Sequence, residues 1–213
     1  STLLNNGLFF QTSVNVQWQL FAAAVWLIGV IIFLGYHVFK HYNFIKMTDR
    51  WSERVPNKQT LKLFESIKRD LNIHSRINLY ICPCIATPMM IGFINPRILL
   101  PLADFSENDL SFILKHELIH YKRRDLWYKC LILVATTMHW FNPIVYLMAK
   151  AVNFQCELSC DAEVIKNTNI DMREKYCEMI IGMVKNQSKL KTALSTNFYG
   201  GKKGMKKRIV SIM

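Results

Sequence analysis

The first 39 residues of the chain contain no Asp, Glu, Lys or Arg, and cations begin directly afterwards at Lys40. Residues 17–39 are predominantly apolar and long enough to cross a hydrocarbon core of about 30 Å as one helix. The cations that follow favour the cytoplasmic side. A signal peptide is the competing interpretation, but no cation precedes the apolar core and no convincing cleavage motif follows it. We therefore expect an extracellular segment at 1–16, a transmembrane helix at 17–39 and a cytoplasmic remainder.

The chain has 27 Lys and Arg against 15 Asp and Glu, a formal net charge of +12. Such an excess suits either nucleic acid or an anionic membrane surface. Because the cations gather directly after the apolar stretch, we expect contact with the lipid bilayer and no direct binding of nucleic acid. In a reducing cytoplasm the six cysteines are expected to remain free thiols.

Residues 116–120 read His-Glu-Leu-Ile-His, a pattern that indicates a zinc site when it lies on a helix. His116 and His120 are four residues apart, so both imidazoles project from one helical face and could bind one Zn²⁺. Glu117 then lies beside the ion as a general base for a water molecule. Ser106 is a suitable N-cap for this helix. The pattern indicates a metallopeptidase.

A two-histidine site lacks a third protein ligand, which the segment Glu157-Leu-Ser-Cys-Asp161 can supply. Glu157 and Asp161 share a helical face, and we assign Glu157 as the ligand and Asp161 as the acid that orients a histidine ring. The reverse assignment stays open, and Glu163 is a weaker candidate. Cys160 is expected to be a packing residue.

The uncharged stretch 130–149 resembles a second membrane span. A span there would put His120 and Glu157 on opposite sides of the membrane, where one ion could not bind both. The stretch must therefore fold back, and Asn142-Pro143 is a plausible break between two helices. We expect an apolar helical hairpin at 126–152, either buried against the domain or inserted into the bilayer.

The remaining segments predict a small sheet and one amphipathic helix. Residues 77–81 alternate as a strand does, 89–100 are typical of a hairpin, and Leu61, Phe64, Ile67 and Leu71 mark one helical face. The fold class is thus α+β and mostly helical, with a small sheet beside the helix of the histidine motif. That sheet either aligns substrate backbone at its edge or merely covers the helix.

Two roles stay open at this point. Asp125 either hydrogen-bonds near the site or caps its helix. A second donor to the oxyanion is expected, with candidates that are each more typical of structural roles: His74, Tyr121, Tyr128, His139 and Tyr146.

Four segments in order resemble the BlaR/MecR family of β-lactam-sensing antirepressor membrane metallopeptidases. They are TPMMIGFINPRILLP (Thr87 to Pro101), HELIHYKRRD (His116 to Asp125), ELSCDAE (Glu157 to Glu163) and FYGGKKGMKKRI (Phe198 to Ile209). The resemblance covers the protease portion of these proteins and not their penicillin-binding sensor domain. The inducing ligand therefore stays open.

The resemblance implies a gluzincin-type zinc domain at 40–199, facing the cytoplasm of a bacterial-type plasma membrane. Its ligands are His116, His120 and Glu157, and its catalytic base is Glu117. It also implies cleavage of a cytoplasmic transcriptional repressor, which induces antibiotic resistance genes, and of the protein itself. The matching position for self-cleavage lies near Lys207 and Arg208, in a basic tail at 200–213 that we expect to be flexible.

One open question and two alternatives accompany this interpretation. The chain is compatible with a homodimer, as sensors often are, but no pattern establishes one. A membrane-protein quality-control or processing zinc peptidase has the same site. A non-proteolytic signalling scaffold could keep the zinc fold without turnover.

Overall fold

The computed structural model describes residues 2–186 and 201–213, and the side chains at 17–183 and 204–213. The described part of the chain is mostly helical and contains one small mixed sheet, in agreement with the expected α+β class. The expected 40–199 domain and the Phe198–Ile209 motif each include residues outside this description.

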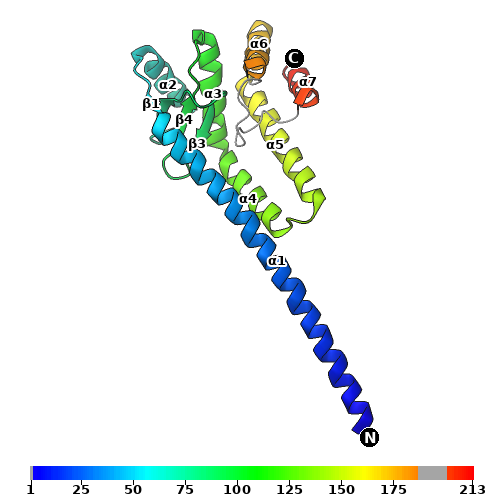
Figure 1. Ribbon diagram of the computed structural model, residues 1–213. Coiled ribbons are helices and arrows are strands. Elements are labelled where there is room, and N and C mark those ends of the chain that lie inside the picture. Colours follow the sequence, from blue (N-terminus) through cyan, green and yellow to red (C-terminus); the bar gives the residue numbers. More distant parts are fainter. Residues whose placement is uncertain (1, 187–200) are drawn as a thin grey trace.

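Helix α1 (Thr2–Trp51) extends away from the rest of the chain in Figure 1. Its segment Gln17–Trp51 is long and apolar enough to cross a membrane. The helix continues well beyond Phe39, where we expected the zinc domain to begin, because no Gly or Pro follows until Pro56. Its last turns are anchored where the buried Phe44 packs into a cluster with strand β3 (Met89–Ile91).

The sheet has the strand order β1-β2-β4-β3. Strands β3 and β4 form the predicted antiparallel hairpin, and β2 pairs with β4 in parallel. Gly92 turns the hairpin with a φ of 91°, and a Cβ at this position would lie 2.4 Å from the Asn95 carbonyl oxygen. Strand β3 therefore lies at one edge of the sheet. The strands are β1 (Glu53–Arg54), β2 (Asn78–Ile81), β3 (Met89–Ile91) and β4 (Arg97–Leu100).

Helices α2 (Lys58–Asp70) and α3 (Glu107–Arg123) pack together and share the main hydrophobic core with the sheet. Helix α3 begins at the predicted cap, where Ser106 Oγ accepts a hydrogen bond from the Asp109 N–H at 3.1 Å. It ends at Arg124, whose left-handed backbone (φ 60°) lets α4 begin at the next residue. Helix α3 is buried along the turn that carries the histidine motif.

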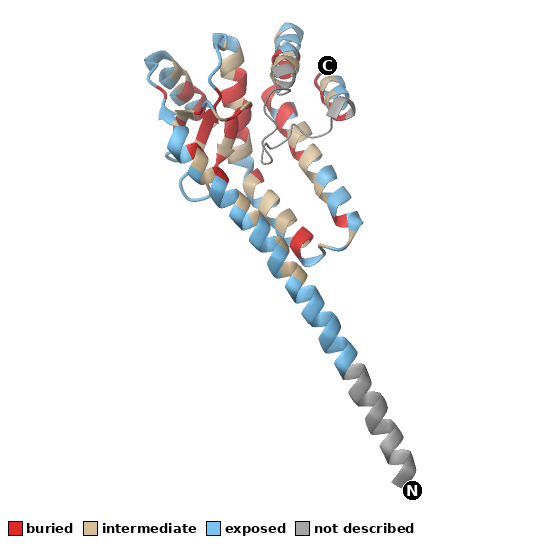
Figure 2. Cartoon of the chain, viewed as in Figure 1, coloured by how far each residue is buried: buried red, intermediate tan, exposed pale blue. Residues whose placement is uncertain are grey.

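The apolar stretch folds back as predicted. Helix α4 (Asp125–Met138) and helix α5 (Pro143–Val164) pack side by side, and Asn142 caps α5 by accepting from the Ile144 N–H at 3.0 Å. The tip of this hairpin contacts α1, because Trp26 Nε1 donates to the Met138 carbonyl at 2.8 Å. Figure 2 shows exposed positions on the hairpin and along much of the described part of α1. Exposed apolar side chains on the hairpin include Trp127, Leu131, Val134, Phe141, Ile144 and Leu147.

The C-terminal segment differs from the expected flexible tail. Helix α7 (Gly201–Ile212) packs against α5 and against α6 (Ile170–Asn186). Ile212 lies in the main hydrophobic core, and Arg208 is buried while Lys206 and Lys207 remain exposed. The composition of the segment suggested a solvated chain. Its partners lie on α5, far away in sequence, and could not be recognised from composition.

Candidate metal centre

The two histidines of α3 direct their imidazoles at one point. The Nε2 atoms of His116 and His120 are 3.0 Å apart, and the two rings meet edge to face with centroids separated by 4.6 Å. Both residues are largely removed from solvent, since α5 and β3 cover this face of α3. The helical spacing read from the sequence therefore has the geometric consequence that it predicted.

Glu157 of α5 lies opposite this pair. Its Oε2 is 3.6 Å from His116 Nε2, and its Oε1 is 3.6 Å from His120 Nε2. Tetrahedral zinc with ligands at 2.0–2.1 Å separates its ligand atoms by about 3.4 Å. The chain's own donor atoms thus lie at spacings that fit a zinc ion, and they meet because α4 and α5 fold back.

Each imidazole also has a partner on its other nitrogen. His120 Nδ1 lies 2.7 Å from Asp125 Oδ2, and His116 Nδ1 lies 2.9 Å from the Tyr176 hydroxyl. Because Tyr176 donates its own proton to Asp161 Oδ1 at 2.8 Å, its oxygen accepts from His116. This network assigns the proton to Nδ1 in both rings and leaves both Nε2 lone pairs available to a metal.

We expected Asp161 to orient a histidine ring directly, but the Tyr176 hydroxyl lies between Asp161 and His116. Asp161 Oδ1 is 3.5 Å from His116 Nδ1, and Tyr176 provides the closer contact. Asp161 in turn accepts from Arg208 Nε at Oδ2 and from Arg208 Nη2 at Oδ1, both at 2.7 Å. Arg208 Nη1 also lies 3.4 Å from Glu157 Oε2. The Asp161 side chain therefore links α7 to the histidine face of α3.

The surroundings set the charge of the two glutamates differently. Burial tends to raise the pKa of Glu157, but in the metal-free protein the neighbouring His116 and His120, when protonated, together with Arg208, outweigh burial and hold the pKa well below its usual value. Burial raises the pKa of Glu117, and a backbone hydrogen bond from Met90 opposes this only in part. Glu157 is thus a stable carboxylate, and Glu117 is the more basic of the two.

Cys160 also lies near the histidines. Ligand-capable atoms of His116, His120 and Cys160 fall within 4.8 Å of one another, so a cysteine is a second candidate for the third donor. However, its Sγ lies beside His116 Nδ1, at 3.5 Å, and contacts the His116 carbonyl oxygen at 3.3 Å. Burial also raises the pKa of this thiol well above its usual value. The thiol therefore fits a packing role better than metal binding, and Glu157 is the better third donor.

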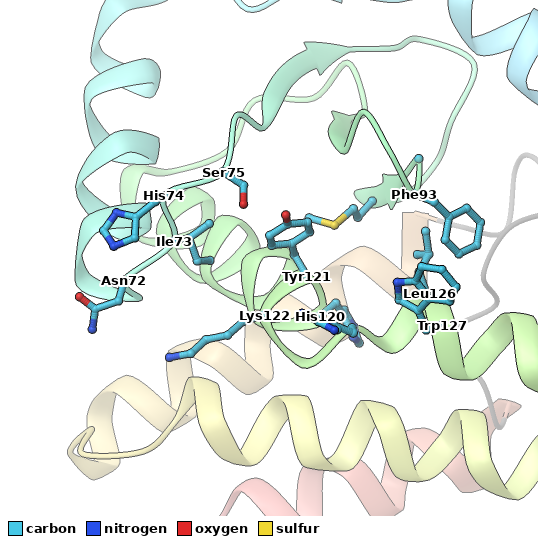
Figure 3. Close-up of a pocket in the computed structure, with 13 residues that line it drawn as sticks. Asn72, Ile73, His74, Ser75, Phe93, His120, Tyr121, Lys122, Leu126 and Trp127 are labelled. Carbon is cyan, nitrogen blue, oxygen red and sulfur yellow. The ribbon is translucent and has the colours of Figure 1, made fainter.

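Two adjacent cavities lie at the centre. A small one of about 40 Å³ borders Glu117, Glu157 and both histidines, together with β3 residues Met89 and Met90. A larger one of about 620 Å³ shares Met90, His120 and Leu126 with it. Figure 3 shows Phe93 and Trp127 together at one end of the larger cavity and Asn72 and His74 at the other. The larger cavity therefore lies directly beside the metal centre.

Several residues of the centre were not recognised from the sequence. No motif marks Tyr176, and Arg208 drew attention only as a candidate cleavage position; Lys207 beside it is exposed. Asp125, left open between two roles, contacts His120. Of the oxyanion candidates, His74 and Tyr121 line the larger cavity, whereas Tyr146 donates to the Trp140 carbonyl at the hairpin tip.

The chain resembles known proteins over most of its length. It is 30% identical to the "Regulatory protein BlaR1" of Bacillus licheniformis over 193 residues, which cover 89% of this chain and 32% of that protein. It is 28% identical to the "Methicillin resistance mecR1 protein" of Staphylococcus aureus over 177 residues, covering 81% and 29%. It is 26% identical to the "Regulatory protein BlaR1" of Staphylococcus aureus over 200 residues, covering 90% and 33%.

The chain therefore spans about a third of the length of these curated relatives. Residues 7–212 match the family profile described as BlaR1 peptidase M56. This match covers nearly the whole chain. The chain belongs to the BlaR1 peptidase M56 family, and thus to the metallopeptidases.

Proposed function

We propose that this chain is the protease portion of a membrane-bound antirepressor, a gluzincin-type zinc endopeptidase that cleaves a cytoplasmic transcriptional repressor and itself. This cleavage would induce β-lactam resistance genes. The observation that carries the proposal is the meeting of His116 Nε2, His120 Nε2 and the Glu157 carboxylate within 3.6 Å. The regulatory and resistance names of the relatives support the antirepressor part of it.

In this mechanism His116, His120 and Glu157 hold the ion and Glu117 is the general base. A bound zinc ion would supply Lewis-acid polarisation of the scissile carbonyl and lower the pKa of a water molecule to about 7. Glu117, which borders the same small cavity, takes the proton of the attacking water. It then passes that proton to the amide nitrogen as the C–N bond breaks. Asp125 and Tyr176 keep the two imidazoles in the required tautomer.

The substrate backbone would be held by strand β3. This strand lies at an edge of the sheet, and its Met89 and Met90 border the cavity that contains Glu117. An extended peptide added to that edge brings a carbonyl group to the metal centre by main-chain hydrogen bonding. The larger cavity next to His120 would take the side chains on one side of the cleaved bond.

The contact between α1 and the hairpin supports a proposed arrangement of the chain in the membrane. In this proposal α1 crosses the bilayer, and the cations from Lys40 onward face the cytoplasm. The hairpin tip touches α1 at Trp26, which lies about 21 Å along a helix from Lys40. A tip at that depth, with apolar side chains exposed, fits a hairpin that enters the bilayer from the cytoplasmic side and returns.

The test is co-expression with a candidate repressor, comparing the wild-type chain with Glu117→Gln. The Glu117→Gln protein should retain zinc at wild-type stoichiometry and yield no repressor fragment, because the ligands remain and only the base is lost. His116→Ala and His120→Ala should lose zinc as well. A repressor fragment of unchanged amount with Glu117→Gln would refute the proposed mechanism. Non-specific degradation in place of one defined fragment would favour a quality-control peptidase.

A further inference from the structure

Among the described side chains of helix α7, one cation is buried and the two cations that precede it in sequence are exposed. Lys206 and Lys207 face solvent, whereas the Arg208 side chain is 1% exposed and points into the interface with α5. A buried guanidinium is tolerated only where carboxylates compensate it with good geometry. At this position the compensating carboxylates are Asp161 and Glu157, which both belong to the metal centre.

The contacts of Arg208 are directional. Its Nε and Nη2 donate to the two different oxygens of Asp161 at 2.7 Å, the fork-to-fork arrangement that fixes both side chains. The remaining nitrogen, Nη1, lies 3.4 Å from Glu157 Oε2. Asp161 is buried and Glu157, one helical turn away, is largely shielded from solvent, so without a cation between them the two carboxylates would repel each other.

This inference rests on the proposed function. We propose that Arg208 is a positioning residue for the metal centre, so that packing of α7 against α5 completes the zinc site. Through Asp161 and Tyr176, Arg208 fixes the orientation of the His116 ring. Through Nη1 it holds the Glu157 carboxylate facing the two Nε2 atoms. Arg208 thereby acts on two of the three proposed ligands without touching the ion or the substrate.

The experiment measures metal binding instead of activity. All proteins carry Glu117→Gln, so that self-cleavage cannot remove α7 during the assay. Zinc affinity is measured by chelator competition, and ligand geometry by the visible spectrum of the cobalt-substituted protein. Arg208→Gln should bind zinc at least about tenfold more weakly, the usual cost of losing such an outer contact, and should change the cobalt spectrum. Arg208→Lys, which keeps the charge without the fork, should recover part of both.

The matched control is Lys207→Gln, which removes a neighbouring but exposed cation of the same helix and should leave both readings unchanged. A double variant, Asp161→Asn with Arg208→Gln, separates positioning from folding because it removes the buried charges together. Its zinc affinity should remain below that of the parent, because Glu157 has lost its contact with Arg208.

A zinc affinity and a cobalt spectrum equal to those of the Glu117→Gln parent, in Arg208→Gln or in the double variant, would overturn the positioning role. Failure of the parent protein itself to bind zinc would instead refute the proposed function.

Discussion

Asp125 reaches back across the junction of α3 and α4, and its Oδ2 lies 2.7 Å from His120 Nδ1. The contact depends on Arg124, whose left-handed backbone ends α3 and starts α4 within one residue. Asp125 is 1% exposed, and its other oxygen accepts from Arg123 Nε at 3.4 Å. The first residue of one helix therefore orients a ring near the end of the previous helix.

Replacing Asp125 by Asn should weaken zinc binding by about 10- to 100-fold, because the amide no longer offers the charged acceptor that fixes the His120 tautomer. Circular dichroism should report an unchanged helix content. The measurement is zinc affinity by chelator competition, with the exposed Asp104→Asn as control. Equal affinities for the two variants would show that Asp125 has no orienting role.

The identity of the third ligand can be tested by exchanging the two candidates separately. Cys160→Ala should keep zinc at wild-type stoichiometry while lowering the free energy of unfolding by about 1 kcal/mol, since it removes a buried sulfur atom. Glu157→Gln should lose most of the zinc, because a neutral amide is a poor ligand. Metal analysis of both purified variants decides, and zinc loss restricted to Cys160→Ala would replace our assignment by a cysteine site.

If the hairpin lies in the bilayer, a leucine on the hairpin and a similarly exposed leucine outside it should differ in how fast a water-soluble thiol reagent labels a cysteine placed there. Leu147 and Leu102 are 63% and 72% exposed, on the hairpin and on a loop after β4 respectively. In membrane fragments that expose both faces, a membrane-impermeant maleimide should label Leu102→Cys rapidly and Leu147→Cys only after detergent is added. Both substitutions are made with Cys84 and Cys130 replaced by Ser. Rapid labelling of Leu147→Cys before detergent would place the hairpin outside the membrane.

The larger cavity should contribute to substrate binding more than to chemistry. Phe93 and Trp127 form one wall of it, with ring centroids 5.5 Å apart. Trp127→Ala should raise the KM for the repressor by about tenfold, equivalent to about 1.4 kcal/mol of lost binding, with little change in kcat. Trp51→Ala is the control, since Trp51 is also exposed and does not line this cavity. A fall in kcat at constant KM would exclude the binding role.

The features that the sequence predicted correctly depend on near neighbours. The Ser106 cap, the β3–β4 hairpin and the break at Asn142-Pro143 are each encoded within a few residues, and all three are present. The proximity of His116 and His120 follows from helical spacing alone. The proximity of Glu157 could be inferred only by requiring one ion to bind all three residues, which in turn forced the hairpin to fold back.

The features that were missed depend on distant residues without a pattern. Tyr176 meets His116 across 60 positions, and Arg208 meets Asp161 across 47. A tyrosine on an amphipathic helix and an arginine in a basic run look like ordinary core and surface residues. The parallel pairing of β2 with β4 was unpredicted for the same reason, because neither strand carries a local signal for its partner.

The place of Arg208 in α7 has a consequence for the self-cleavage that we propose at Lys207–Arg208. The Lys207–Arg208 peptide bond is part of a helix, whereas a peptidase cleft takes an unwound chain. A molecule that unwinds α7 to present this bond also withdraws Arg208 from its own Asp161. We therefore expect the cut to be made in trans, by a neighbouring copy whose α7 is intact. The cleaved copy would then lose the Arg208 contact that we propose supports the zinc site, so that each self-cleavage would remove one active protease from the response.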